Sequence, residues 1–241
     1  MNSRRAFVLC VPVLLMATPS SSADFSSPSH RWSGCHATIQ GSYDSMSVST
    51  TYGARPGDNL DGLRATKDLN PNGFGVGGGL GCDWQTGNWV FGILGDGAFA
   101  NLDEDVVETR FPNYRFGIES DWFATVRGRV GYAMDRGLIF NVPTLWYVTA
   151  GGAWAGLEAR NYIPGVQTTG RDENTASGWT VGWGSENALD QRWSIKTETL
   201  YVDYGKNTFF TPNDPVSGGE IKTDTSEWVT RIGLTYKLNS W

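Results

Sequence analysis

The feature that most constrains this chain is a two-residue alternation of side chains, which recurs in segments of roughly ten residues. The clearest case is "EWVTRIGLTYKL", residues 227–238. One face of this segment carries Trp228, Thr230, Ile232, Leu234, Tyr236 and Leu238, and the other carries Val229, Arg231, Gly233, Thr235 and Lys237. A period of two is the pattern of a β-strand with two different faces. Helical periodicity is hard to find, so the alternation predicts an all-β fold.

Strand-like segments of this kind occur eight times. They are 32–46, 73–84, 89–102, 121–133, 144–157, 178–189, 193–205 and 225–238. Long polar connections alternate with short ones, and the long ones are 47–72, 103–120, 158–177 and 206–224. An even strand count with this loop asymmetry is typical of a barrel in an outer membrane. A closed barrel also pairs every backbone group inside lipid. We therefore predict a closed eight-stranded antiparallel transmembrane β-barrel.

Tryptophan, of which the chain has 11, gathers at the expected strand ends. The examples are Trp84, Trp89, Trp122, Trp179, Trp193 and Trp228. Aromatic girdles at both edges of an apolar outer face are a mark of membrane barrels. A secreted soluble β-barrel that binds a ligand remains the alternative. It explains less well why the larger face of each strand is the one that carries Trp, Tyr and Ile.

The first residues have the pattern of an export signal. Arg4 and Arg5 precede the apolar run "AFVLCVPVLLMA", and small residues end the segment at Ala23. This pattern predicts a signal peptide over 1–23, cleaved after Ala23, then a short periplasmic segment over 24–31 and the barrel over 32–241. "SRRAF" also fits a twin-arginine signal, so the export route stays open. The net charge of -6, without a basic run, argues against nucleic acid as a partner.

Motifs for catalysis, cofactors or metals are missing from the sequence. There is no H-E-x-x-H, and "GWGSEN" lacks the closing glycine of G-x-S-x-G. The two histidines, His30 and His36, provide no metal-ligand set, and His36 is expected to be a hydrogen-bonded interior residue. A G-x-G-x-x-G match at 73–78 is followed by a turn and a strand rather than by the helix of a dinucleotide site. We expect no enzyme activity, no cofactor and no metal.

The glycines of that match have a structural interpretation. Gly73, Gly75, Gly77, Gly79 and Gly81 share the inward parity of one strand. An inward face without side chains leaves room for long side chains from other strands. Glycine also permits sharp strand curvature.

Six segments, taken in order, resemble a known family. They are "GGGLGCDWQTGNWVFGILGD", "WFATVRGRVGYAMDR", "LWYVTAGGAWAG", "GWTVGWGSEN", "WSIKTETLYVDYG" and "VTRIGLTYKL". They are similar to successive strands of the small outer-membrane β-barrel proteins of alphaproteobacteria, the porin-family or outer-membrane immunogenic proteins. The resemblance implies an OmpA-type eight-stranded barrel in the cell outer membrane, with both termini in the periplasm and the long loops at the cell surface.

The last strand also resembles the signal that the barrel-assembly machinery reads. Arg231, Gly233, Tyr236 and Leu238 occupy its polar, glycine and two apolar places, with Leu238 where phenylalanine is usual. The resemblance implies the assembly machinery as a partner during biogenesis, and outer-membrane lipid and lipopolysaccharide as partners afterwards.

Charged residues collect on the inward parity of the strands. They are Asp96, Arg127, Arg129, Glu186, Lys196, Glu198 and Arg231. Buried charges must pair, because unpaired ions are costly to desolvate. Eight strands leave an interior that side chains just fill. We therefore expect a charged network that plugs the lumen and a structural, envelope-integrity role with a surface-exposed end. A narrow small-solute porin remains the alternative.

Cys35 and Cys82 lie on the outward parity of the first two strands, near the same end. Pairing them places Tyr43 opposite Phe74, which is a sensible register for antiparallel neighbours. Both cysteines follow the proposed cleavage site, so they would reach an oxidising compartment. We predict a cross-strand disulfide; the alternative is two small apolar residues facing lipid.

Overall fold

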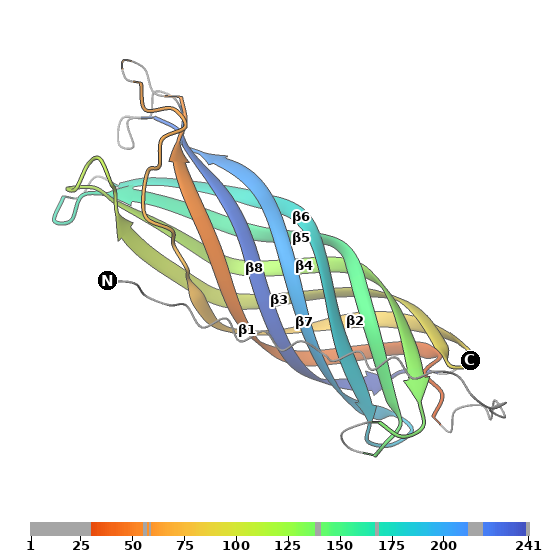
Figure 1. The fold of residues 1–241 in the computed structure, drawn as a ribbon. Coiled ribbons are helices and arrows are strands. Elements are labelled where there is room, and N and C mark those ends of the chain that lie inside the picture. Colours follow the sequence, from red (N-terminus) through yellow and green to blue (C-terminus); the bar gives the residue numbers. More distant parts are fainter. Residues whose placement is uncertain are drawn as a thin grey trace, which may run out of the picture.

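The computed structural model describes residues 30–54, 57, 59–137, 141–166, 169–211 and 219–239. The predicted signal peptide, most of the segment 24–31 and the last two residues lie outside these ranges. Eight strands follow one another: β1 (Gly34–Tyr52), β2 (Asn72–Thr86), β3 (Trp89–Val107), β4 (Arg115–Met134), β5 (Thr144–Tyr162), β6 (Thr169–Ala188), β7 (Trp193–Phe209) and β8 (Ile221–Lys237). Each pairs antiparallel with its neighbours, and β8 pairs with β1 to close the ring (Figure 1). The predicted fold class is confirmed.

The two ends of the barrel differ. At the turn end, the connections 87–88, 135–143 and 189–192 join successive strands. The first and last described residues also meet there, since the Leu238 amide donates to the Cys35 carbonyl over 2.8 Å. The opposite end, which carries the other four connections, is called the loop end below.

The strands extend further toward the loop end than the sequence predicted. They run to 20 residues, and the β5–β6 ladder continues up to the pair Tyr162 and Thr169. The four predicted loop ranges were therefore too wide, because backbone pairing continues where the outer face turns polar. Even the β1–β2 connection is partly ordered: the Val48 amide donates to the Leu69 carbonyl over 2.9 Å. The segment 63–71 therefore lies beside β1, where it extends the line of β2 toward the loop end.

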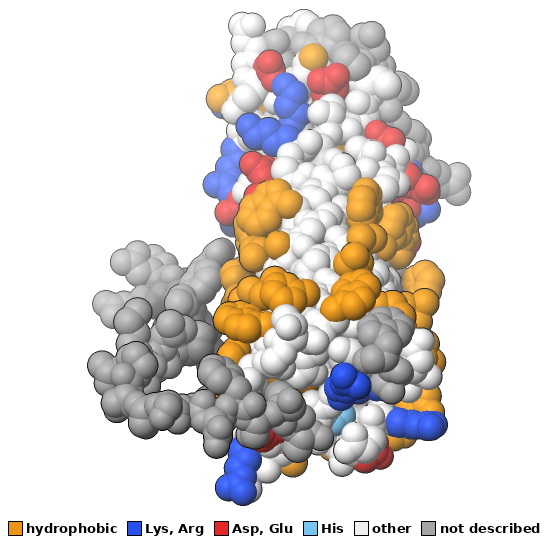
Figure 2. Space-filling view, turned by 90° about the vertical axis from the view of Figure 1, so that its right-hand side faces the viewer, with side chains coloured by type: hydrophobic (Ala, Val, Ile, Leu, Met, Phe, Trp, Pro, Cys, Tyr) orange, Lys and Arg blue, Asp and Glu red, His pale blue; other side chains and the backbone are white. Residues whose placement is uncertain are grey.

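The middle of the outer wall is apolar. Figure 2 shows hydrophobic side chains gathered in a band, with charged side chains above and below it. Ring pairs mark the turn-end edge of the band, where Trp89 contacts Tyr132 at 5.5 Å and Trp193 contacts Tyr236 at 4.7 Å between centroids. A wall with this pattern suits hydrocarbon rather than water. Among the described residues, no helix has the length and apolarity to cross a bilayer.

The interior is filled in three layers. Along β7, the inward side chains are Ser194, Lys196 and Glu198, followed by Leu200 and Val202 toward the loop end. The charged layer therefore lies nearer the turn end. An upper apolar layer lies in the loop half, beside the buried polar side chains of Asp44, Glu108, Asn161 and Glu227. Its residues include Met46, Leu69, Leu102, Phe116, Ile118, Leu157, Leu200, Phe209 and Ile221. An apolar cap closes the turn end and consists of Trp32, Val90, Ala133, Leu145, Tyr147 and Ala188.

Candidate functional site in the barrel lumen

The upper half of the charged layer is centred on Asp96 of β3. Arg127 of β4 donates to its Oδ2 atom over 2.5 Å, and Arg231 of β8 pairs with its other oxygen. Arg127 also lies 3.0 Å from Oε1 of Glu198 on β7, and the Tyr147 hydroxyl donates to that same oxygen over 3.0 Å. Two arginines and two carboxylates from four strands therefore form one ion-pair cluster across the lumen.

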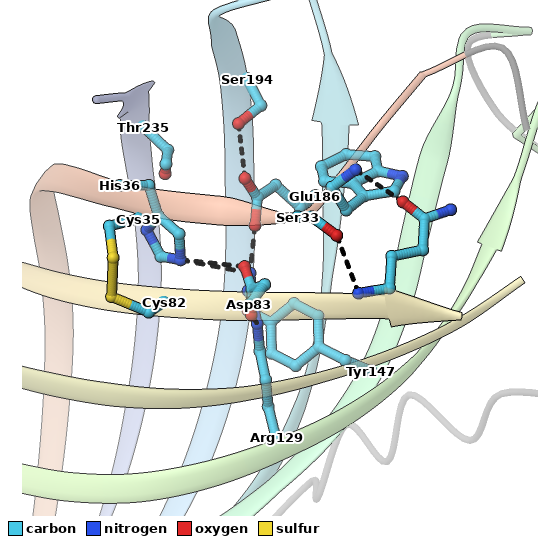
Figure 3. A network of polar contacts seen from close by, with 12 residues as sticks. Ser33, Cys35, His36, Cys82, Asp83, Arg129, Tyr147, Glu186, Ser194 and Thr235 are labelled. Atoms are coloured by element: carbon cyan, nitrogen blue, oxygen red, sulfur yellow. Dashed lines mark hydrogen bonds and ion pairs between the residues drawn. A yellow bond between two sulfur atoms is a disulfide. The ribbon is translucent and has the colours of Figure 1, made fainter. Parts of the chain in front are cut away.

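The lower half is centred on Arg129 of β4 (Figure 3). Its Nε donates to Asp83 of β2 over 2.8 Å, and its Nη1 donates to Glu186 of β6 over 3.0 Å. His36 of β1 places Nε2 3.1 Å from the second oxygen of Asp83, and the Ser194 hydroxyl donates to Glu186 over 2.6 Å. This cluster ties four strands to Arg129.

Glycines on the inward faces make room for these side chains. A Cβ at Gly92 would overlap the carboxylate of Asp83, and a Cβ at Gly184 would lie 2.5 Å from the Tyr147 hydroxyl. A methyl group at either position would displace a polar group that holds an arginine. The glycine pattern therefore positions the network as well as shaping the strands.

All seven residues predicted for the network point into the lumen. Six of them form ion pairs, whereas Lys196 is buried without an ion pair to any described residue. The sequence prediction missed Asp83 and Tyr147, although both have inward parity. It also missed two acids above the network: Asp44 accepts from Ser42 over 3.0 Å, and Glu227 accepts from Tyr204 over 2.9 Å.

The charged layer is balanced. Its cations are Arg127, Arg129, Lys196 and Arg231, and its anions are Asp83, Asp96, Glu186 and Glu198. The formal charges of these four cations and four anions sum to zero. Buried ions in this arrangement hold strands in register, and removing one partner leaves another uncompensated. Within the described ranges, no group of three His, Cys, Asp or Glu residues is placed to hold a metal.

The residues before β1 fold into the mouth of the barrel. Trp32 is 4% exposed, and its amide donates to the side-chain oxygen of Gln85 over 2.7 Å. The Gln85 amide in turn donates to the Ser33 hydroxyl over 2.9 Å. The His30 ring packs against Trp32 with centroids 4.6 Å apart. The segment 30–33 therefore closes the turn end below the charged layer.

This closure is expected to loosen in acid. Burial, and then the charge of Lys237, lower the pKa of His30 from 6.5 to about 4. A released segment binds its proton near pH 6.5, so falling pH favours release between pH 6.5 and 4. The protection factors of the Trp32 and Gln85 amides, which correct hydrogen exchange for its intrinsic pH dependence, should fall as the pH is lowered over this range.

The control for that prediction is His30→Gln. Glu186, Asp190 and Lys237 also face His30 electrostatically, and this substitution leaves all three unchanged. The protection factors of the same two amides in the variant should be nearly constant between pH 6.5 and 4. The same acid response in both proteins would contradict the role of His30.

At the base of β1, Cys35 and Cys82 form a disulfide with an S–S distance of 2.01 Å. They are direct partners in the β1–β2 register, which also places Tyr43 opposite Phe74 with ring centroids 5.3 Å apart. The bridge therefore joins the first two strands beside the cap.

The residues of the expected assembly signal lie along β8 and just beyond it. Arg231 and Gly233 face the lumen. Tyr236 contacts Trp193 on the outer wall, and Leu238 is exposed at the turn end.

Known proteins place this geometry in a family. The model for the outer membrane protein beta-barrel domain matches residues 11–237. The 31 kDa outer-membrane immunogenic protein of Brucella melitensis is 25% identical over 232 residues, covering 93% of this chain and 91% of that protein. The 22 kDa outer membrane protein of Rhizobium leguminosarum bv. viciae is 30% identical over 171 residues, covering 71% and 69%.

A solved structure agrees on the fold. The outer membrane protein OprG of Pseudomonas aeruginosa superimposes with a TM-score of 0.54 at 15% identity, covering 89% of this chain and 100% of that one. At that identity the likeness concerns the fold alone. The family match spans nearly all of the barrel, and the relatives are outer-membrane proteins. The chain therefore belongs to the outer membrane protein beta-barrel domain family and resides in the outer membrane.

Proposed function

We propose that this protein is a non-catalytic, structural barrel that contributes to envelope integrity and exposes its loop end at the cell surface. The observation that supports the proposal is the burial of the inward side chains. The ion-pair network lies between an apolar cluster in the loop half, which also surrounds the buried acids Asp44 and Glu227, and an apolar cap around Trp32 at the turn end. Water and small solutes have little room in such an interior.

The charged layer supports a structural role through its connectivity. Arg127 and Arg129 leave the same strand, β4, and bind carboxylates on β2, β3, β6 and β7. Such cross-lumen pairs act as internal struts, because each arginine satisfies two carboxylates from different strands. A selective pore needs charges that can exchange partners with passing ions. In this lumen, Arg127 and Arg129 each form ion pairs with two carboxylates, so these two arginines already engage six of the eight charged groups.

We propose an orientation of the barrel in the outer membrane in which the turn end faces the periplasm and the loop end faces the outside of the cell. The loop end carries outward charges, such as Arg160 with Glu119 at 3.3 Å and Arg171 with Glu158 at 2.8 Å. Lipopolysaccharide and membrane lipid are the proposed partners of the wall, and the barrel-assembly machinery is the proposed partner of β8.

The Brucella relative is named for being immunogenic, which fits an exposed loop end. The alternative of a secreted soluble binder is wrong, because the family resides in the outer membrane.

Conductance in a planar bilayer tests the plugged lumen. The purified barrel should insert without producing discrete current steps, because the two apolar layers block a continuous water path. Insertion is verified separately by flotation of the protein with lipid vesicles. Reproducible steps from flotation-positive protein would contradict the plug and favour the small-solute porin.

A further inference from the structure

The outer wall contains a groove, here called the wall groove, that crosses β6, β7, β8 and β1. It encloses about 650 Å³. Its floor is made of small residues from three strands: Gly41, Thr197, Thr199 and Thr230. Aromatic side chains close it at both ends: Trp146 and Trp183 on one side, Tyr43 and Phe74 on the other. The register connects these parts in one row, since Trp183 pairs with Thr199, Thr199 with Thr230, and Thr230 with Tyr43.

The groove is hollow because large outward residues on each strand give way to small ones. On β7, Thr197 and Thr199 lie between Ile195 and Tyr201. The hydroxyl groups of Ser185 and Thr197 hydrogen-bond to each other over 3.0 Å, so this polar pair in the groove satisfies itself. Pairing these two hydroxyls lowers the cost of desolvating them under an apolar occupant.

The position of the groove restricts its occupant. Exposed hydrophobic side chains, among them Phe74, Trp183 and Ile232, line it on a wall that faces lipid, so hydrocarbon is the medium around it. The aromatic residues at its ends stand above the floor and would hold a second convex barrel away from Thr199 and Thr230. A flexible chain can reach the floor between them. Lipid tails are as apolar as the wall, so such a chain is held by packing rather than by the hydrophobic effect.

A cation lies outside the groove, toward the turn end of the barrel. Arg192, in the turn between β6 and β7, is exposed and donates to the Tyr236 hydroxyl over 3.0 Å. It precedes Thr197 by five positions, or roughly 16 Å of extended chain. The neighbouring carboxylate of Asp190 accepts from the backbone amides of Arg192 and Trp193, each over 2.7 Å. Because Asp190 is engaged with its own turn, the guanidinium can meet an external phosphate.

From these features we propose that the wall groove binds one glycerophospholipid, with an acyl chain on the Thr197–Thr199–Thr230 floor and its phosphate paired with Arg192. The lipid belongs to the periplasmic leaflet, an assignment that rests on the orientation proposed above. It would fill the hollow on the side of the barrel where β8 closes onto β1.

Native mass spectrometry of the purified barrel in mild detergent tests this inference, with dioleoyl phosphatidylglycerol as the titrated probe. One lipid should bind at least about tenfold more tightly than those that follow. Thr199→Trp fills the floor and should remove this preference. Arg192→Gln, at an exposed turn outside the strands, should weaken the first binding step about fivefold. Val126→Trp, on the outer face of β4 away from the groove, is the matched control and should bind as the original protein does.

Each outcome decides the question. Equal affinity for successive lipids would overturn the proposal, and so would unchanged binding in both Thr199→Trp and Arg192→Gln. A lipid-free dimer would instead assign the groove to a second copy and would overturn it as well. Faster migration in unboiled gels verifies that each variant is folded. The result is separable from the proposed function, because a non-conducting barrel without the lipid preference fails only this inference.

Discussion

Replacing Arg129 by methionine is expected to lower the free energy of unfolding by about 3–5 kcal/mol. The side chain is 2% exposed and holds Asp83 of β2 and Glu186 of β6 at once. Methionine fills much of the same volume but leaves two buried carboxylates without their cation. Urea unfolding of the reconstituted barrel, followed by tryptophan fluorescence, measures the loss.

Two further variants separate this cause from a general loss of charge. Arg171→Met removes an exposed arginine that also pairs with a carboxylate, Glu158, and should cost less than about 1 kcal/mol. Adding Asp83→Asn and Glu186→Gln to Arg129→Met removes the uncompensated charges and should restore much of the stability. If Arg129→Met and Arg171→Met had equal effects, the lumen network would contribute no more than a surface pair.

The two-residue alternation in the sequence was enough to predict the strands and which side chains face the lumen. In "EWVTRIGLTYKL", parity alone separated the lumen residue Arg231 from the wall residues Trp228 and Ile232, and the structure places them on those faces. Strand ends were not predictable in the same way. Above the apolar band both faces become polar, and nothing in the composition distinguishes a paired strand such as Thr169–Ala188 at its start from a loop.

The candidate site was predictable as a set of residues but not as a set of pairs. Parity placed Arg129 in the lumen, yet its partners come from β2 and β6, and such contacts depend on strand tilt across the barrel. Asp83 occupies the next inward position of β2 after Gly81, so the alternation of the glycines would have placed it in the lumen. The apolar cluster in the loop half was missed in part because inward residues such as Phe116 and Ile118 lie in the segment 103–120, which was predicted to be a loop.

The substitution Gly77→Phe is expected to prevent folding, at a cost of at least about 3 kcal/mol, the upper part of the range for overpacking. Gly77 pairs with Ala98 across the β2–β3 ladder. A Cβ at Gly77 would lie 2.7 Å from the Ala98 Cα and would overlap the Gly97 carbonyl oxygen. The inward glycines of β2 are therefore needed for the close approach of the β3 backbone, in addition to any room they leave for arginines. The folded fraction, read as the fast-migrating band in unboiled gels, should nearly vanish.

Gly95→Phe is the matched control, because it introduces the same side chain on the strand next to Gly77. Gly95 faces outward, and a Cβ there would meet nothing closer than the Thr125 carbonyl oxygen at 4.0 Å. The added ring would enter hydrocarbon, where it is tolerated, and the strand would lose the flexibility that glycine confers. This variant should therefore fold about as well as the original protein. Equal folding of the two variants would mean that the β2–β3 approach does not limit closure, and equal failure would mean that any large residue near this ladder blocks it.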